Sequence, residues 1–236
     1  MEVRPETQNL KAVRGIAVHA GAEVLLRAQM WDGDPEEAMF SAQAAVVRTL
    51  WDEITMGDVR ADPKITPIQA EASALLCLDV YRSSVLPTIE HPTGVEVEFQ
   101  FEVDGWPYSG IIDALADDLH DLKTTASRPS NGDRYDVAMT GYALGYRAVT
   151  GHAERSIVLD YIVATQKPYY WPIRRDPATD DDIDRFASVV GGVARGIEQG
   201  NFRPTGLDKR YECRACPHRE TCTYYAALNE EGEPDA

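Results

Sequence analysis

The sequence lacks several features that would each point to a class of protein. Its 236 residues contain no apolar run near the length of a membrane span, and the first residues lack the apolar core of a signal peptide. No Gly-x-x-x-x-Gly-Lys-Ser/Thr phosphate loop is present, which argues against an ATPase or a helicase. Internal repeats and low-complexity tracts are also missing. These absences predict a globular cytoplasmic protein with no membrane partner.

Cysteine is scarce, with four residues in the chain. Cys213, Cys216 and Cys222 lie within ten residues of one another, which in a cytosolic chain indicates metal binding rather than disulfides. His218 lies between two of them, so a zinc site is one open alternative. Cys77 stands among leucines in a predicted helix, where a buried core thiol is the favoured interpretation.

Positive charge is in deficit, since the formal net charge is −16. This argues against broad nucleic-acid binding, but the charge is unevenly spread. Residues 123–175 hold eight Lys/Arg and four Asp/Glu, or +4, which leaves −20 for the rest. Six tyrosines and Trp171 lie in the same window. Basic residues interleaved with aromatics suit a local path for a single nucleic-acid strand, although tyrosines that pack a core explain the pattern equally well.

Hydrophobic periodicity divides the chain into helices and strands. The apolar spacing and the turn residues predict helices at 12–30, 35–56, 66–86, 135–149 and 179–199. Alternation of apolar and polar residues predicts a strand at 95–103 that places Val95, Val97, Phe99, Phe101 and Val103 on one face. Further strands are expected at 108–116, at 157–164 as a strand buried on both faces, and at 171–174 as an edge strand.

Residues 110–125 form the stretch around which the chemistry is organised. They read as a β-hairpin with Asp113 on one strand and Asp121, Leu122 and Lys123 on the next. Asp121 and Lys123 are two residues apart and share one face, while Leu122 points to the other. Two carboxylates and a lysine on one sheet edge suit a metal-dependent phosphodiesterase. Glu96 and Glu98 could add ligands, although solvated strand charges are the favoured interpretation.

The hairpin sets a geometric condition. A two-residue turn would put Asp113 and Asp121 on opposite faces, whereas an odd loop such as Ala116-Asp117-Asp118 puts them opposite each other on the same face. We therefore predict the odd loop, or a bulge that has the same effect. Taken alone, His19 in the first helix reads as a structural histidine with small neighbours.

In this order the motifs resemble the PD-(D/E)XK nuclease superfamily, and in particular its RecB-type exonuclease branch, which includes CRISPR-associated adaptation nucleases and phage exonucleases. The matching segments are Gly15-Ile-Ala-Val-His19, Gly110-Ile-Ile-Asp113, Asp121-Leu-Lys123-Thr-Thr125, a helix with Tyr142, and the C-terminal cysteine cluster. The resemblance covers about residues 12–225. It implies an α/β, restriction-endonuclease-like fold with a central mixed β-sheet flanked by helices and a Cys-rich C-terminal segment.

The resemblance also implies roles for residues. Asp113, Asp121, the backbone carbonyl of Leu122 and the imidazole of His19 would hold Mg²⁺ or Mn²⁺, and Lys123 would orient the attacking water. DNA, as single strands or duplex ends, would be hydrolysed in DNA processing or recombination, in a bacterial or phage-infected cell. The expected DNA contacts are Tyr142, Arg128 and Arg134. A homo-oligomer or a recombination complex is the expected assembly.

Two positions depart from the family pattern. Ala138 stands four residues before Tyr142, where the family usually has Gln. This keeps open the alternative of a catalytically weak DNA-binding subunit in a recombination or CRISPR-adaptation complex. The C-terminal cysteines resemble the staple that holds a 4Fe–4S cluster, whose fourth cysteine comes from near the N-terminus, but no cysteine precedes His19. Three alternatives stay open: Cys77 is the fourth ligand, residues upstream of this sequence supply it, or His218 completes a zinc site instead.

The resemblance and the length predict one nuclease domain over residues 1–236. Within it we expect a Cys-rich metal-binding segment at 200–225. The acidic residues 229–236 are expected to be a disordered tail.

Overall fold

The computed structural model describes residues 8–57, 59–60, 65–129 and 136–201. Two long helices come first, α1 (Leu10–Met30) and α2 (Pro35–Met56), followed by α3 (Pro67–Val80). A π-turn at Tyr81–Val85 and a 3₁₀ turn at Leu86–Thr88 continue α3. No described helix is both long enough and apolar enough to cross a membrane. The first three predicted helices are confirmed.

A five-stranded mixed sheet follows in the order β3-β4-β5-β6-β7. Only β5 and β6 run parallel; the other neighbours are antiparallel. A separate two-residue pair joins β1 and β2. The strands have these bounds: β1 Gln8–Asn9, β2 Val59–Arg60, β3 Gly94–Val103, β4 Trp106–Leu115, β5 Leu119–Thr125, β6 Ile157–Val163 and β7 Tyr169–Arg175. The α/β fold with a central mixed sheet is as expected.

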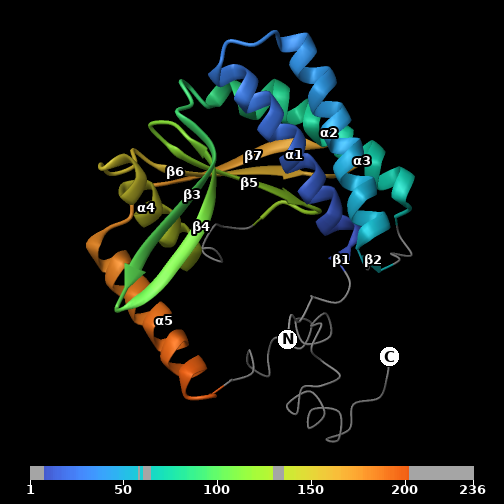
Figure 1. Cartoon of the computed structure of the whole chain (residues 1–236). Helices are drawn as coiled ribbons and strands as arrows, with labels where there is room; N and C mark the ends of the chain where they lie inside the picture. The colour runs from blue at the N-terminus through green and yellow to red at the C-terminus, as the bar shows by residue number, and fades with distance from the viewer. Residues whose placement is uncertain (1–7, 58, 61–64, 130–135, 202–236) are drawn as a thin grey trace, which may run out of the picture.

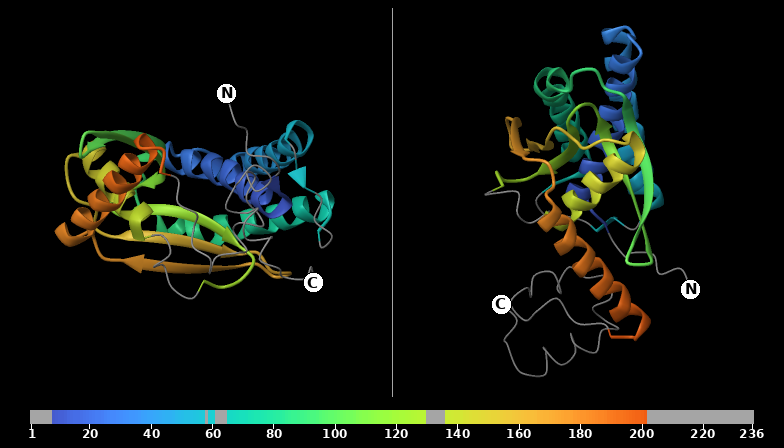
Figure 2. Two further views of the ribbon diagram at one scale, coloured as in Figure 1. Left: turned by 90° about the horizontal axis from the view of Figure 1, so that it is seen from below. Right: turned by 90° about the vertical axis from the view of Figure 1, so that its left-hand side faces the viewer.

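Two helices complete the described chain. The helix α4 (Asp136–Thr150) lies between β5 and β6 in sequence, and α5 (Asp180–Glu198) follows β7. Thr179 caps α5 through a reciprocal capping box with Asp182, and the acidic first turn complements the helix dipole. Figure 1 shows α1, α2 and α3 packed together and apart from α4 and α5, and the left view of Figure 2 shows the same separation from below.

The core has two parts, one on each face of the sheet. On β6, Leu159 and Tyr161 pack into a cluster with α4, while Ile162 packs into a cluster with α1, α2 and α3. Because alternate side chains of a strand point to opposite faces, the two clusters lie on opposite faces. All seven residues of β6 are buried, which confirms the prediction of a strand covered on both sides. The strand β7 is an edge strand, as predicted, and it contains Pro172, a residue that sheets tolerate mainly at their edges.

One expectation about the sheet is wrong. Val95 was expected on the face of Val97 and Phe99, but Val95 packs with α1–α3 whereas Val97 and Phe99 pack with α4. The intervening Glu96 has a left-handed backbone with φ of 50°, which interrupts the alternation. The interruption lies where the functional side chains gather.

Candidate functional site

The ladder between β3 and β4 breaks at one position. The pairing runs from Gly94↔Leu115 to Val103↔Trp106 with a constant register but skips Glu96 and Asp113, which face each other across the gap. The left-handed backbone at Glu96 turns its side chain out of the regular alternation. Both carboxylates are partly buried. Two acidic side chains thus approach each other where neither belongs to a regular ladder.

The hairpin between β4 and β5 has the predicted odd loop. Leu115 pairs with Leu119, so the loop is Ala116-Asp117-Asp118. The two strands pair only at this end and separate beyond Ala114↔His120. There the backbone N–H of Leu122 donates to Asp113 Oδ2 over 2.7 Å. The Asp113 carboxylate therefore lies in the gap between the strands and bonds β5 in place of a backbone carbonyl.

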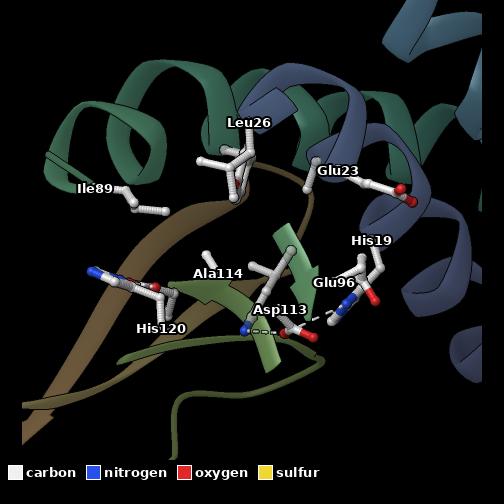
Figure 3. Close-up of a pocket in the computed structure, with 12 residues that line it drawn as sticks. His19, Glu23, Leu26, Ile89, Glu96, Asp113, Ala114 and His120 are labelled. Carbon is white, nitrogen blue, oxygen red and sulfur yellow. Dashed lines mark hydrogen bonds and ion pairs between the residues drawn. The ribbon is translucent and has the colours of Figure 1, made fainter. Parts of the chain in front are cut away.

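The helix α1 brings His19 to this gap. A Cβ on Gly15 would lie 2.8 Å from Thr124 Oγ1, so the glycine allows α1 to approach β5 closely. His19, one turn further on, places Nδ1 3.7 Å from Asp113 Oδ2. Figure 3 shows His19 and Glu96 side by side and facing Asp113. The close approach at Gly15 therefore allows α1 to bring His19 to Asp113.

His19, Glu96 and Asp113 each offer a ligand atom, and these atoms lie within 4.8 Å of one another. Burial, and then the negative charge of Asp113, raise the pKa of Glu96 to about 7. The positive charge of Arg27 opposes this shift but does not cancel it. The position of Glu96 beside His19 and Asp113 favours the ligand alternative over a solvated strand charge, whereas the neighbouring Glu98 is exposed. In the sequence, Glu96 and Glu98 occupy equivalent positions in the alternating pattern. Only the left-handed backbone at Glu96, which interrupts the β3–β4 pairing, distinguishes them.

Asp121 and Lys123 form an ion pair on the α4 side of β5. Lys123 Nζ donates to Asp121 Oδ1 over 2.7 Å and lies 2.6 Å from Oδ2. Asp121 is 3% exposed, and its Oδ2 accepts no well-oriented hydrogen bond from the described residues. Burial raises the pKa of Asp121 although Lys123 opposes the shift. Burial also works against a charged Lys123, but the carboxylates of Asp121 and Asp113 raise its pKa overall.

The predicted metal ligands are therefore near one another but not all in one cluster. Asp113 contacts both His19 and β5, whereas Asp121 lies outside the group of close ligand atoms and pairs with Lys123. The charges of Asp113 and Lys123 nevertheless act on Asp121. Asp113 thus stands between two sets of groups, a histidine and a glutamate on one side and a carboxylate–lysine pair on the other.

A cavity of about 20 Å³ adjoins Asp113. This is room for about one water molecule. A second pair lines it, in which His120 Nδ1 lies 2.8 Å from Asp160 Oδ2. Tyr170 donates from its hydroxyl to Asp160 Oδ1 over 2.5 Å. The residues that line the cavity are His19, Ala22, Glu23, Leu26, Tyr81, Ile89, Glu96, Asp113, Ala114, His120, Leu122 and Asp160.

The expected DNA contacts fall in different places. Tyr142 on α4 is half-buried edge-on against Phe99, and burial, followed by the charge of Asp121, raises its pKa. Arg128 is exposed and stacks over Trp171 at 3.5 Å from the ring centre. Arg134 lies outside the described residues. Among the other tyrosines of this window, Tyr146 and Tyr161 are buried and follow the core interpretation, whereas Tyr169 is 40% exposed.

The cysteine prediction is only partly covered by the described residues. Cys77 is fully buried among α1, α2 and α3, which supports a core thiol. The rest of the prediction lies outside the described residues, which end at Asn201. This applies to the predicted metal-binding segment 200–225 beyond Asn201, with Cys213, Cys216, His218 and Cys222, and to the tail 229–236.

Comparisons with known proteins give the family and the fold of the chain. The family model of the PD-(D/E)XK nuclease superfamily matches residues 1–223. A solved crystal structure of a proposed exonuclease from Eubacterium rectale aligns with a TM-score of 0.50 and 14% sequence identity. The alignment covers 82% of this chain and 72% of that one, and at this identity it shows a shared fold alone. No curated protein matches the chain.

Proposed function

The chain belongs to the PD-(D/E)XK nuclease superfamily, and from this premise we propose that it is a Mg²⁺- or Mn²⁺-dependent DNA exonuclease. The observation that carries the proposal is the position of Asp113. Its carboxylate joins His19 and Glu96 on one side and the β5 strand with Asp121 and Lys123 on the other. A phosphodiesterase needs both a cation site and a lysine close together.

The residues fit a hard divalent cation. His19, Glu96 and Asp113 offer a nitrogen and carboxylate oxygens within 4.8 Å of one another, and Asp121 Oδ2 is a buried oxygen that accepts no well-oriented hydrogen bond from described groups. These four residues, with the Leu122 carbonyl, would hold the ion. The ion would supply Lewis-acid polarisation of the phosphate and a lower pKa for the attacking water.

Lys123 would stabilise the negative charge that develops on the phosphate in the transition state. Asp121 holds its Nζ at 2.7 Å, and the surrounding carboxylates keep the amine charged. An ammonium group fixed in a mostly buried setting stabilises added negative charge more strongly than one in water. Asp113 fixes the strand that carries Lys123 through the N–H of Leu122. The chain itself thus orients both carboxylates and the lysine.

The strands that carry part of the site also carry an open groove. An open groove of about 690 Å³ lies on β3 and β4, lined by Glu98, Phe99, Gln100, Ser109, Gly110 and Ile111. The same two strands carry Glu96 and Asp113. We propose that a DNA end reaches the site along this side of the sheet, with Tyr142 near Lys123 on the other.

A catalytically weak DNA-binding subunit is the alternative, and Ala138 in place of Gln before Tyr142 is the observation in its favour. In either role, action within a DNA-processing or recombination complex is proposed by analogy with the family. The cysteines Cys213, Cys216 and Cys222 are proposed to bind a 4Fe–4S cluster, with zinc as the alternative. Iron and zinc analysis of anaerobically purified protein tests this point, and zinc without iron would refute the cluster.

The test of function is a cleavage assay with Mg²⁺ or Mn²⁺ on four labelled substrates. These are linear and circular DNA, each single-stranded and double-stranded. An exonuclease degrades the linear forms and spares the circles. Lys123→Ala, expressed and purified in parallel, should be inactive. Equal cleavage by both proteins would indicate a contaminant or a wrong site, whereas DNA binding without any cleavage would favour the alternative.

A further inference from the structure

A row of side chains leads from Lys123 across the sheet. In the parallel pair of β5 and β6, Lys123 is opposite Tyr161, and in the antiparallel pair of β6 and β7, Tyr161 is opposite Trp171. Directly opposite residues point to the same face. Strands lie about 4.8 Å apart, so Trp171 is about 10 Å from Lys123. The indole therefore lies within reach of a nucleotide next to one held at Lys123.

Arg128 adds a positive charge to this row. Its guanidinium carbon lies 3.5 Å from the centre of the Trp171 ring, in a stacked cation–π contact. Arg128 itself is exposed and Trp171 is partly exposed. No carboxylate among the described residues forms an ion pair with Arg128, although the chain has 39 Asp and Glu against 23 Lys and Arg. A cation that forms no ion pair with any described carboxylate is available to a phosphate.

A further aromatic ring extends the row. Tyr169 is two residues before Trp171 on β7, so it points to the same face, and 40% of it is exposed. Within the sheet, α4 packs mainly against β3 and β4, so Tyr169 and Trp171 on β7 lie at the far edge of this face, where Trp171 packs partly against the α4 cluster. Because β7 is the last strand of the sheet, nothing in the described sheet continues past it. Among the described residues, this end of the face therefore leaves Tyr169 and Arg128 exposed and Trp171 partly exposed.

We propose that Arg128 and Trp171, extended by Tyr169, form a stacking platform for a single DNA strand beside the cleavage site. This inference rests on the proposed function and adds a substrate form to it. Nucleobases stack on aromatic rings and on guanidinium planes without sequence preference, and arginine also contacts the backbone phosphates. A duplex keeps its bases stacked on each other, so the platform favours a single strand. Arg128 and Trp171 act as positioning residues.

Binding without cleavage gives the direct test. The full-length protein with Ca²⁺ in place of Mg²⁺ is titrated against fluorescent oligothymidine, and anisotropy gives the Kd. Trp171→Ala and Arg128→Ala should each raise the Kd about 5- to 100-fold, as loss of one base stack predicts. Trp171→Phe should restore most of the affinity because it keeps an aromatic face. A blunt duplex of the same length should show a smaller change.

Matched controls separate the platform from a general loss of charge or aromatic surface. Trp31 is 75% exposed at the end of α1, and Arg48 is exposed on α2, on the other side of the sheet. Trp31→Ala and Arg48→Ala should bind the oligonucleotide as the parent does. Arg128→Glu, at an exposed position, keeps the test valid if Trp171→Ala does not fold. In steady-state cleavage the platform variants should change KM more than kcat.

The two proposals fail in different ways. If the parent protein cleaves single-stranded DNA and the platform variants show the parent's Kd and KM, the platform is refuted and the nuclease stands. If the parent binds oligothymidine through Trp171 and Arg128 but cleaves no DNA with either metal, the platform is supported and the nuclease assignment fails. A parent that binds no single strand at all refutes the platform.

Discussion

Two histidine–carboxylate pairs lie at the two ends of one small cavity, and they differ in how well they are satisfied. His120 and Asp160 are 2.8 Å apart, and their side chains are 3% and 2% exposed. Tyr170 donates to the second oxygen of Asp160. His19 and Asp113 are 3.7 Å apart, with side chains 30% and 22% exposed. Figure 3 shows His120 turned away from the group around His19.

The difference in burial and distance between the two pairs indicates that one stabilises the fold and the other belongs to the site. A buried polar group must be hydrogen-bonded, and the His120 pair meets this condition with protein partners alone. The His19 pair is too long for a direct hydrogen bond and stands beside the partly buried carboxylate of Glu96. Such an arrangement costs stability unless a cation completes it. The same two residue types therefore serve the fold at one end of the cavity and a site at the other.

The largest effect should come from Asp113→Asn. The substitution keeps the shape of the side chain but removes the charge that faces His19 and Glu96, so DNA cleavage should fall by about a thousandfold or more. The free energy of unfolding should change by about 1 kcal/mol or less, because one partly exposed hydrogen bond is affected. Initial rates with Mn²⁺ and urea denaturation measure the two quantities. Retained cleavage would remove Asp113 from the site.

The next largest effect should come from Asp160→Ala at the other end of the cavity. Its removal leaves His120 and the Tyr170 hydroxyl without their partner in a buried setting, so the free energy of unfolding should fall by about 3–5 kcal/mol. Urea denaturation monitored by circular dichroism gives this value. Asp113→Ala serves as the matched carboxylate deletion and should cost much less. Equal losses would abolish the distinction between the two pairs.

A smaller effect is expected from Glu96→Gln. Removal of one anionic ligand should weaken Mn²⁺ binding roughly tenfold to a hundredfold, since ligand charge sets the affinity for such ions. Calorimetric titration of Mn²⁺ measures the affinity. Glu98→Gln is the control, because Glu98 is two residues away on the same strand and is exposed. A similar loss in both variants would show that the effect is long-range charge rather than ligation.

The smallest effect concerns the pH dependence of the metal-free protein. The folded pKa of Glu96 is about 7, above the ordinary 4.5, so between these values the folded state binds more protons than the unfolded state. The contribution of Glu96 to the free energy of unfolding is therefore present at low pH and falls as the pH rises through this window. Solvent screening keeps the change modest, since Glu96 is only half-buried.

Urea denaturation in EDTA at several pH values tests this slope. Glu96→Gln should be less sensitive to pH than the parent between pH 4.5 and 7, while Asp121 retains its own contribution in the same direction. Added Mn²⁺ should reverse the trend, because it stabilises the deprotonated carboxylates. A parent and variant with the same slope would show that Glu96 is not the group responsible.

Much of the fold was predictable because local patterns agree with the tertiary structure. The spacing of apolar residues placed the helices to within a few residues, and the odd loop at 116–118 followed from the demand that Asp113 and Asp121 share a face. Glu96 was not predictable as a site residue, because alternation treats Glu96 and Glu98 alike. His120 was not foreseen either, since one buried histidine in a strand carries no signal of its distant partner Asp160.

The sequence by itself determined the order of the elements and the residue types that carry the chemistry. The sequence pattern predicts Asp113 on one strand of a hairpin and Asp121 and Lys123 on the next. Only the tertiary structure decided which histidine meets which carboxylate, and that Trp171 stands in the row of Lys123. The reason is that strand register and helix approach join residues far apart in the chain, and these contacts depend on how the whole sheet packs.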